Sequence, residues 1–181
     1  MTVRLYQDID GCLNVYASGQ PWAESKDEDG LRGELSGTAF SFFDHSGDRT
    51  TGLVTKFAMK WNSRLIDALN ELDVELVWTT TWRADAPGVG KLVGLSHRNR
   101  VLHPKNGKTT FPSIHWKYEA LVAEQQESPS PFIWVDDEII DLPRAAIETI
   151  HQLGGLYICP DPMFGMTPLH LERMREYIAQ H

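Results

Sequence analysis

Short apolar runs recur along the chain at lengths typical of buried β-strands. Each has four or five residues and carries β-branched or aromatic side chains, which favour a strand over a helix. The runs lie at residues 3–7, 74–78, 100–103, 132–135 and 156–159. They therefore predict five strands spread along the whole chain.

Between most of these runs, apolar residues recur every three or four positions, as on one face of a helix. The first such segment carries Leu65, Ile66 and Leu69, with Asn62 or Ser63 as its N-cap. Further helical segments lie at residues 117–125, 142–155 and 167–178. Strands that alternate with helices predict an α/β fold, a three-layer α/β/α Rossmann-like domain with a mostly parallel sheet.

One long segment, at about residues 15–57, departs from this alternation. It is rich in Gly, Ser and Asp, and two apolar stretches on either side of His45, Ser46 and Gly47 predict a β-hairpin. An insertion directly after the first strand would hang over the carboxyl edge of the sheet, where lids and binding loops are common. We expect residues 1–181 to form a single domain with this lid or hairpin insertion.

Composition narrows the classes of protein. The 181 residues are 41% hydrophobic, enough for a sizeable core, and the net charge of -8 disfavours unspecific coating of a nucleic-acid backbone. No apolar run approaches the roughly 18 residues of a membrane helix, so we expect a cytoplasmic protein with no membrane partner. Cys12 and Cys159 lie in apolar segments and are expected to be reduced core thiols. The oligomeric state is not predicted.

The charges are unevenly distributed. Residues 86–118 contain no acid but six basic residues, so the rest of the chain holds 11 basic residues against all 25 acids. Such a stretch can be a solvated basic face, or it can be an edge that faces a polyanion. Both interpretations stay open at this point.

The sequence DIDG, residues 8–11, also has two interpretations. Asp-Gly between apolar residues is a good hairpin signal, because Gly11 accepts a positive φ and Asp10 tolerates one. Alternatively, Asp8 and Asp10 follow a buried strand and lie at the carboxyl edge, where open α/β sheets bind ligands.

The ends of the other predicted strands favour the second interpretation. Thr79, Thr80 and Thr81 follow the second strand, and Asp136 and Asp137 follow the fourth. Between these strands, Lys117 lies at the predicted start of a helix, where its ammonium and the free helix amides can face an anion. In a parallel sheet these ends share one edge, so acids, hydroxyls and a lysine converge.

Phosphoryl transfer through an aspartate uses this set of groups. Carboxylates bind Mg²⁺, which offsets the repulsion between a carboxylate nucleophile and a phosphate dianion. A hydroxyl and a lysine bind the remaining phosphate oxygens. A second acid can protonate the leaving oxygen and later take a proton from water.

Four ordered motifs carry a family resemblance. The segments YQDIDGCLN, LVWTTTW, HWKYEAL and FIWVDDE resemble the motifs of the haloacid dehalogenase (HAD) superfamily of phosphohydrolases, and they cover residues 3–138. The segment CPDPMFGMTPLHLERMREY resembles the closing segment of the HAD-type domain of bacterial and phage RNA-repair proteins. The resemblance implies a HAD-like fold and a Mg²⁺-dependent phosphatase, a phosphoric monoester hydrolase with a possible place in nucleic acid repair.

The resemblance also implies residue roles at the reacting centre. Asp8 would be the nucleophile that forms an aspartyl-phosphate, and Asp10 the general acid and base, which also binds Mg²⁺ through its backbone carbonyl. Thr80 would bind the phosphoryl group, with Thr79 as an alternative. Lys117 would pair with Asp8 and the phosphoryl group.

The same resemblance assigns the metal ligands and the access to the site. Asp136 would complete the metal site with Asp137 beside it, and either can be the direct ligand. The HAD superfamily often controls access with a large cap domain. Here a hairpin takes its place, which implies an open site for a bulky substrate.

The residues around these motifs indicate the substrate class. Thr81, Trp82, Arg83 and Trp116 lie near the expected phosphate, and the two tryptophans either pack in the core or a lid, or stack on a base. With the acid-free segment, they make a nucleotide or a phosphorylated polynucleotide end the preferred substrate. Two alternatives stay open: a phosphatase of a small phosphorylated metabolite, and a non-catalytic module with this fold that binds nucleic acid or a partner.

Overall fold

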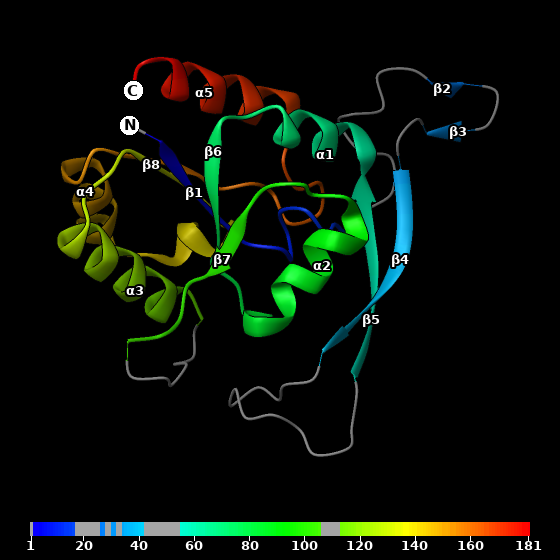
Figure 1. The fold of residues 1–181 in the computed structure, drawn as a ribbon, viewed down its shortest axis with the longest axis horizontal. Helices are drawn as coiled ribbons and strands as arrows, with labels where there is room; N and C mark the ends of the chain where they lie inside the picture. The colour runs from blue at the N-terminus through cyan, green and yellow to red at the C-terminus, as the bar shows by residue number, and fades with distance from the viewer. Residues whose placement is uncertain (1, 17–25, 28–29, 32–33, 42–54, 106–112) are drawn as a thin grey trace.

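A computed structural model of the chain describes residues 2–16, 26–27, 30–31, 34–41, 55–105 and 113–181. Five strands form its central sheet, in the order β7-β6-β1-β8-β9, and every neighbouring pair is parallel (Figure 1). The strands are β1 (Val3–Gln7), β6 (Val74–Trp78), β7 (Asn99–Val101), β8 (Phe132–Val135) and β9 (Gly155–Ile158). The five predicted strands are confirmed, with the ends of β7 and β9 shifted by one or two residues.

Helices cover both faces of this sheet, as Figure 1 shows. The helices are α1 (Ser63–Asn70), α2 (Ala86–Val93), α3 (Ser113–Glu127), α4 (Arg144–Gln152) and α5 (Pro168–Ala179). The core has two parts. On one face α1, α2 and α5 pack with Leu5 and Leu76, and on the other α3 and α4 pack with Tyr6 and Trp134. The three-layer Rossmann-like fold is thereby confirmed.

The order of the strands indicates where on the sheet a binding site is expected. From β1 the chain first builds outward through β6 to β7, and then α3 carries it back to β8 on the other side of β1. In open α/β sheets, ligands bind at the carboxyl ends of the strands where this winding reverses. The ends of β1 and β8 are therefore the expected place for a site.

Local signals in the sequence define several helix ends. Asn62 is the N-cap of α1, where its side chain accepts a hydrogen bond from the backbone N–H of Arg64. Thr167 caps α5 in the same way. After α4, Gly154 adopts a φ of +79°, which glycine tolerates and which ends the helix.

The helix α2 was not predicted, because its sequence APGVGKLV holds a proline and two glycines, which are poor helix formers. Packing explains one of them. A Cβ on Gly90 would lie 2.8 Å from the ring of the buried Trp78, whereas a Cβ on Gly88 would have no heavy atom within 4 Å. Gly90 therefore allows α2 to lie close against β6.

The insertion contains an antiparallel hairpin. Strands β4 (Glu34–Ser41) and β5 (Thr55–Asn62) pair in register from Glu34 opposite Asn62 to Ser41 opposite Thr55, and a shorter pair is formed by β2 (Lys26–Asp27) and β3 (Gly30–Leu31). The predicted turn around residues 45–47 lies outside the described residues. The insertion was expected to end at about residue 57; its strand β5 continues to Asn62 and leads directly into α1.

Two expectations from composition concern the membrane and the cysteines. Within the described ranges, no helix combines the length and the apolar character needed to cross a membrane. Cys12 is a buried free thiol, as expected, whereas Cys159 is only half-buried.

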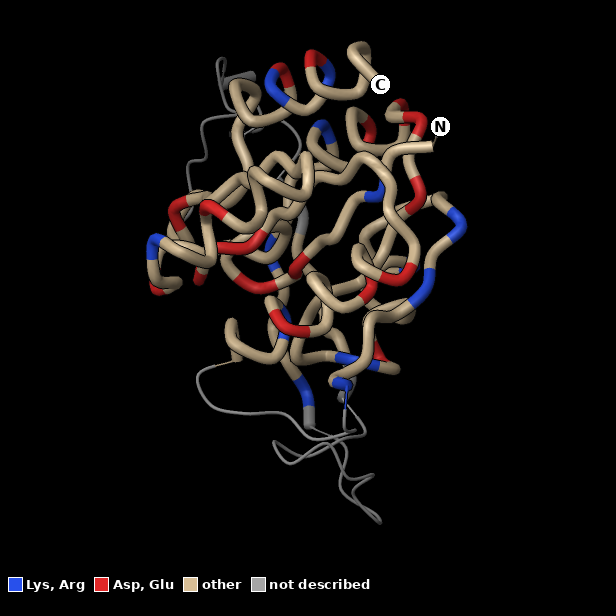
Figure 2. The backbone as a smooth tube through the Cα atoms, turned by 90° about the vertical axis from the view of Figure 1, so that its left-hand side faces the viewer, with Lys and Arg blue, Asp and Glu red and all other residues tan. Residues whose placement is uncertain are grey.

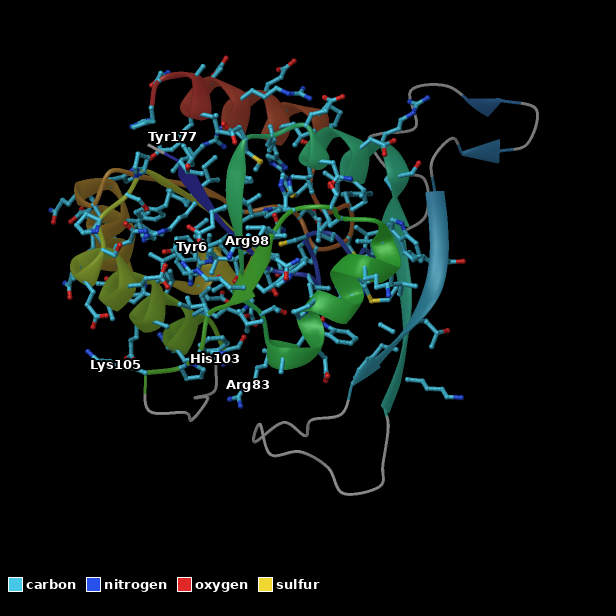
Figure 3. The ribbon with its side chains drawn as sticks, in the orientation of Figure 1. Tyr6, Arg83, Arg98, His103, Lys105 and Tyr177 are labelled. Atoms are coloured by element: carbon cyan, nitrogen blue, oxygen red, sulfur yellow. The ribbon has the colours of Figure 1, made fainter. Side chains whose placement is uncertain are left out.

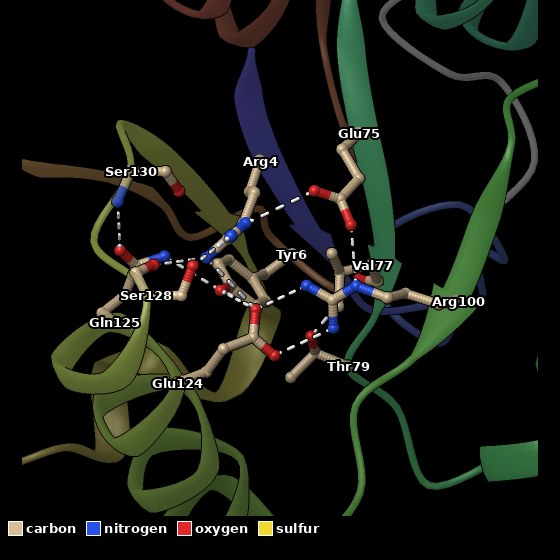
Figure 4. A network of polar contacts seen from close by, with 10 residues as sticks. All are labelled: Arg4, Tyr6, Glu75, Val77, Thr79, Arg100, Glu124, Gln125, Ser128 and Ser130. Atoms are coloured by element: carbon tan, nitrogen blue, oxygen red, sulfur yellow. Dashed lines mark hydrogen bonds and ion pairs between the residues drawn. The ribbon is translucent and has the colours of Figure 1, made fainter. Parts of the chain in front are cut away.

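A polar network joins β1, β6 and β7 to α3 (Figure 4). Arg100 donates to Glu75 at 2.7 Å and to Glu124 at 2.8 Å, and the Tyr6 hydroxyl donates to Glu124 at 2.6 Å. Arg4 lies 3.4 Å from Glu75. The network therefore pairs the charges of two arginines and fixes the edge strand β7 to the rest of the fold.

The two glycines of α2 give a matched test of the packing. Gly90→Ala is expected to lower the free energy of unfolding by about 1–3 kcal/mol, because the added methyl group collides with the Trp78 ring. Gly88→Ala is expected to raise it by about 0.5–1 kcal/mol, because alanine favours the helix and meets no neighbour. Urea unfolding of both variants measures the difference, and equal effects would contradict the close packing of α2.

Candidate active site

The strand ends bring the predicted acids together. Asp8 directly follows β1 and Asp136 directly follows β8. The sheet hydrogen bonds continue into both residues: the Asp8 N–H donates to the Val135 carbonyl at 3.0 Å, and the Asp136 N–H to the Ile158 carbonyl at 3.1 Å. The backbone of both aspartates is thus fixed by the sheet, and both side chains are buried.

Lys117 lies between the two aspartates. Its Nζ donates to Asp8 Oδ2 at 2.7 Å and to Asp136 Oδ2 at 2.8 Å, and Glu138 Oε2 lies 3.5 Å away. The lysine side chain is only 1% exposed. One predicted detail was wrong: α3 begins at Ser113, so Lys117 lies one turn inside the helix and not at its free amides.

Burial and charge together set the proton affinities of these groups. Burial raises the pKa of Asp8 above its ordinary value, and Lys117 and a hydrogen bond from Thr80 offset part of this rise. Burial and the charge of Asp8 raise the pKa of Asp136. Burial would lower the pKa of Lys117, but the two carboxylates outweigh it and raise that pKa well above its usual value. Lys117 is therefore the stable cation of the group.

The side chains of the three consecutive threonines have different surroundings. The hydroxyl of Thr80 hydrogen-bonds to Asp8, and Thr80 is fully buried. Thr79 instead donates to the Val77 carbonyl at 3.3 Å and lies among the network residues of Figure 4. Thr81 is exposed. Of the two predicted phosphate-binding hydroxyls, Thr80 is the one beside Asp8.

Three carboxylates fit a divalent cation. Asp8, Asp136 and Asp137 each offer an oxygen, and these oxygens lie within 4.8 Å of one another. Burial and the charge of Asp8 raise the pKa of Asp137 to about 6. One lysine pairs with two of the three acids, so a further positive charge is needed to keep all of them ionised. An all-oxygen set of this kind suits Mg²⁺.

The DIDG segment turns sharply after β1, as both interpretations required. The N–H groups of Leu13 and Asn14 donate to the Ile9 carbonyl at 2.9 Å. Gly11 has a φ of +67°, and a Cβ on it would lie 2.3 Å from Asp137 Oδ2. Only glycine fits there, both for its backbone and for its closeness to Asp137. The turn belongs to the site and does not connect two hairpin strands.

Asp10, the second acid, is half-buried and has a partner on each oxygen. Asn14 Nδ2 donates to its Oδ1 at 2.7 Å, and Trp82 Nε1 donates to its Oδ2 at 2.8 Å. Asp10 is not among the three acids whose side-chain oxygens lie close enough for a shared cation. The predicted metal contact of Asp10, through its backbone carbonyl, stays a prediction.

The two tryptophans near the expected phosphate are both buried. Trp116 lies on the buried face of α3 and is 2% exposed. Trp82 is 6% exposed, and Phe57 packs edge-on against it with the ring centroids 4.9 Å apart. Neither offers a free ring face, so both pack in the core, which is one of the two roles expected of them, and base stacking is not supported. Arg83 begins the short helix η1 (Arg83–Asp85) with a φ of +48°, which is uncommon for a residue other than glycine.

The basic residues that the structure describes between positions 86 and 118 do not form one continuous surface. Arg100 is paired with Glu75 and Glu124, Lys117 is buried in the site, and Lys108 lies outside the described residues. In Figure 2 the basic positions are scattered over the tube. In Figure 3, Arg83, His103 and Lys105 are drawn toward the carboxyl end of the sheet, and Arg98 is drawn nearer the middle of the view.

Three residues of the site were not predicted. Glu138 lies near Lys117 and accepts a hydrogen bond from the Ser113 hydroxyl; its signal was the third acid of the run DDE. Asn14 holds Asp10, and nothing in its sequence context indicates this. Tyr16 is 56% exposed, and burial together with Asp10, Asp137 and Asp8 raises its pKa to about 12.

Comparisons of this chain with protein-family models, with curated proteins and with solved structures gave no match.

Loss of Lys117 tests the charge balance. We expect Lys117→Met to lower the free energy of unfolding at pH 7.5 by about 3–5 kcal/mol, because two buried carboxylates lose their partner. The pKa values of Asp8 and Asp136 then rise further above their unfolded values, so stability is lost as pH rises and the deficit is smaller at pH 4.5. Urea unfolding with a chelator present measures both. Lys105→Met, at an exposed lysine, is the control, and equal losses at both lysines would contradict the account.

Metal binding should depend on pH in a defined direction. Mg²⁺ competes with protons, and the pKa of Asp137 is about 6. We therefore expect the affinity for Mg²⁺ to be about tenfold weaker at pH 5 than at pH 7.5, as protonation of one ligand requires. Titration calorimetry measures this, and Asp137→Asn should reduce the pH dependence, while Asp8 and Asp136, whose pKa values are also raised, account for the remainder. Equal affinity of the unmodified protein at both pH values would show that Asp137 is no ligand.

Proposed function

We propose that this protein is a Mg²⁺-dependent phosphatase that works through an aspartyl-phosphate on Asp8. One observation carries the proposal: a buried lysine joins Asp8 to Asp136, with the Thr80 hydroxyl on the same carboxylate, at the point of the sheet where ligands bind. A carboxylate that is paired with a lysine and contacted by a hydroxyl is placed to attack a phosphoryl group. The resemblance of the four sequence motifs to HAD phosphohydrolases points the same way.

In this mechanism, Asp8 attacks the phosphorus atom and the bond from phosphorus to the leaving oxygen breaks. Asp10 donates a proton to that oxygen, then takes a proton from the water that hydrolyses the aspartyl-phosphate. Lys117 and Thr80 hold phosphoryl oxygens as negative charge shifts onto them. Asp8, Asp136 and Asp137 would hold Mg²⁺, which when bound would neutralise charge between the nucleophile and the phosphate.

A nucleotide or a phosphorylated polynucleotide end is the substrate class we favour. The two buried tryptophans do not support this substrate class, but two surface features do. The exposed Tyr16 lies two positions after Asn14, which holds Asp10, and can stack on a base. Arg83, His103 and Lys105 lie at the same end of the sheet, where they can contact further phosphates.

The nucleophile is tested by one substitution. The purified protein is expected to release phosphate from p-nitrophenyl phosphate with Mg²⁺ and not with a chelator, and Asp8→Asn is expected to abolish this release. An amide cannot form the acyl-phosphate, so a loss of at least about 1000-fold is expected. Asp73→Asn, at an exposed aspartate, is the matched control. Full activity of a folded Asp8→Asn protein would disprove the mechanism.

The substrate class is tested by a panel of phosphomonoesters. We expect kcat/KM to be about tenfold or more higher for 3′- or 5′-phosphorylated oligonucleotides than for sugar phosphates, because a base and further phosphates add contacts. Tyr16→Ala should reduce this preference without changing turnover of a sugar phosphate. A preference for sugar phosphates would favour a small metabolite as the substrate.

A further inference from the structure

The carboxylate of Asp10 is held by two donors from different parts of the chain. The indole N–H of Trp82 donates to Oδ2 at 2.8 Å, and the side-chain amide of Asn14 donates to Oδ1 at 2.7 Å. The end of an aspartate side chain otherwise rotates through a broad range of angles. With one donor on each oxygen, the plane of the Asp10 carboxylate is fixed.

The hairpin strand β5 supports both donors. The Lys60 N–H donates to Asn14 Oδ1 at 2.9 Å, which leaves the amide nitrogen of Asn14 facing Asp10. The Val15 N–H also donates to the Lys60 carbonyl at 3.0 Å. On the other side of Asp10, Phe57 packs against the Trp82 ring. Strand β5 therefore contacts each of the two residues that hold Asp10, Asn14 through Lys60 and Trp82 through Phe57.

Trp82 is also distinct from the other buried tryptophans. In the part of the chain that the structure describes, the indole nitrogens of Trp61, Trp78, Trp116 and Trp134 are buried without a hydrogen-bond partner. The indole of Trp82 has one, and it is Asp10. Its backbone N–H faces the Thr80 hydroxyl at 3.4 Å, so Trp82 touches residues on both sides of the reacting centre.

We propose that Trp82 and Asn14 are positioning residues that hold the Asp10 carboxylate for proton transfer to the leaving oxygen, and that β5 keeps both in place. The inference rests on the proposed function, because it takes Asp10 as the general acid. Proton transfer depends strongly on geometry: a misplacement of about 1 Å can cost about 100-fold in rate. The hairpin then contributes to catalysis as well as packing against α1 and α2.

The dependence on the leaving group separates this role from a structural one. An alkoxide needs a proton to leave, whereas p-nitrophenolate leaves without one. The ratio kcat/KM covers the steps up to departure of the alcohol, so it excludes the later role of Asp10 as a base. We expect Trp82→Phe to lower kcat/KM for an alkyl phosphate such as glycerol phosphate by about tenfold or more, and for p-nitrophenyl phosphate by less than about twofold.

Trp78→Phe is the matched control. It makes the same change, from tryptophan to phenylalanine, at another buried position, but there the indole N–H that is lost has no hydrogen-bond partner. We expect it to change kcat/KM for both substrates by the same factor, and thermal unfolding compares the stability of the two variants. If Trp82→Phe does not fold, Asn14→Ala removes the other donor and takes its place. An equal loss for both substrates in the variant that folds would overturn the proposal.

A double-substitution cycle with Asp10→Asn completes the test. If Trp82 acts through Asp10, Trp82→Phe should not change the alkyl-to-aryl ratio further once Asp10 is replaced. A further change of that ratio would overturn the inference. The proposed function fails in a different way: Asp10→Asn itself would then leave the alkyl-to-aryl ratio unchanged, or the unmodified protein would hydrolyse neither substrate.

Discussion

The contact of one buried ammonium with two aspartates is the interaction on which the rest of the site depends. Lys117 lies within 2.8 Å of both Asp8 and Asp136, and all three groups are removed from water. Two buried carboxylates without this cation would be neutralised by protons and would lose their nucleophilic character. The two aspartates follow the adjacent parallel strands β1 and β8, and the lysine comes from α3, the helix that leads into β8. The fold therefore brings together the three groups whose charges balance one another.

Much of the fold was predictable because it rests on local signals. The five apolar runs, the N-cap at Asn62 and the glycine stop after α4 each act over a few residues, and the structure has all of them. The helix α2 was not predictable in this way, since it depends on Gly90 fitting against Trp78, a contact between elements. The extent of β5 likewise follows from its pairing with β4 and not from its own composition.

The candidate site also has a part that the sequence predicts and a part that depends on contacts between distant residues. The convergence of Asp8, Thr80, Lys117 and Asp136 follows from parallel topology, so the sequence was sufficient. Charge partners were not predictable: the basic residue Arg100 turned out to be paired with acids that lie 24 and 25 positions away. For Trp82 the sequence left core packing and base stacking open, and the distant Phe57, which packs against its ring, decides for core packing.

A structure of the protein with Mg²⁺ and beryllium trifluoride tests the central claim most directly, because this fluoride mimics a phosphoryl group on an aspartate. The account predicts beryllium bonded to a side-chain oxygen of Asp8, with fluorines contacted by Lys117 and Thr80, and Mg²⁺ bound by Asp8 together with Asp136 or Asp137. Beryllium trifluoride on another residue, or none bound while Lys117 keeps its contacts with Asp8 and Asp136, would contradict it.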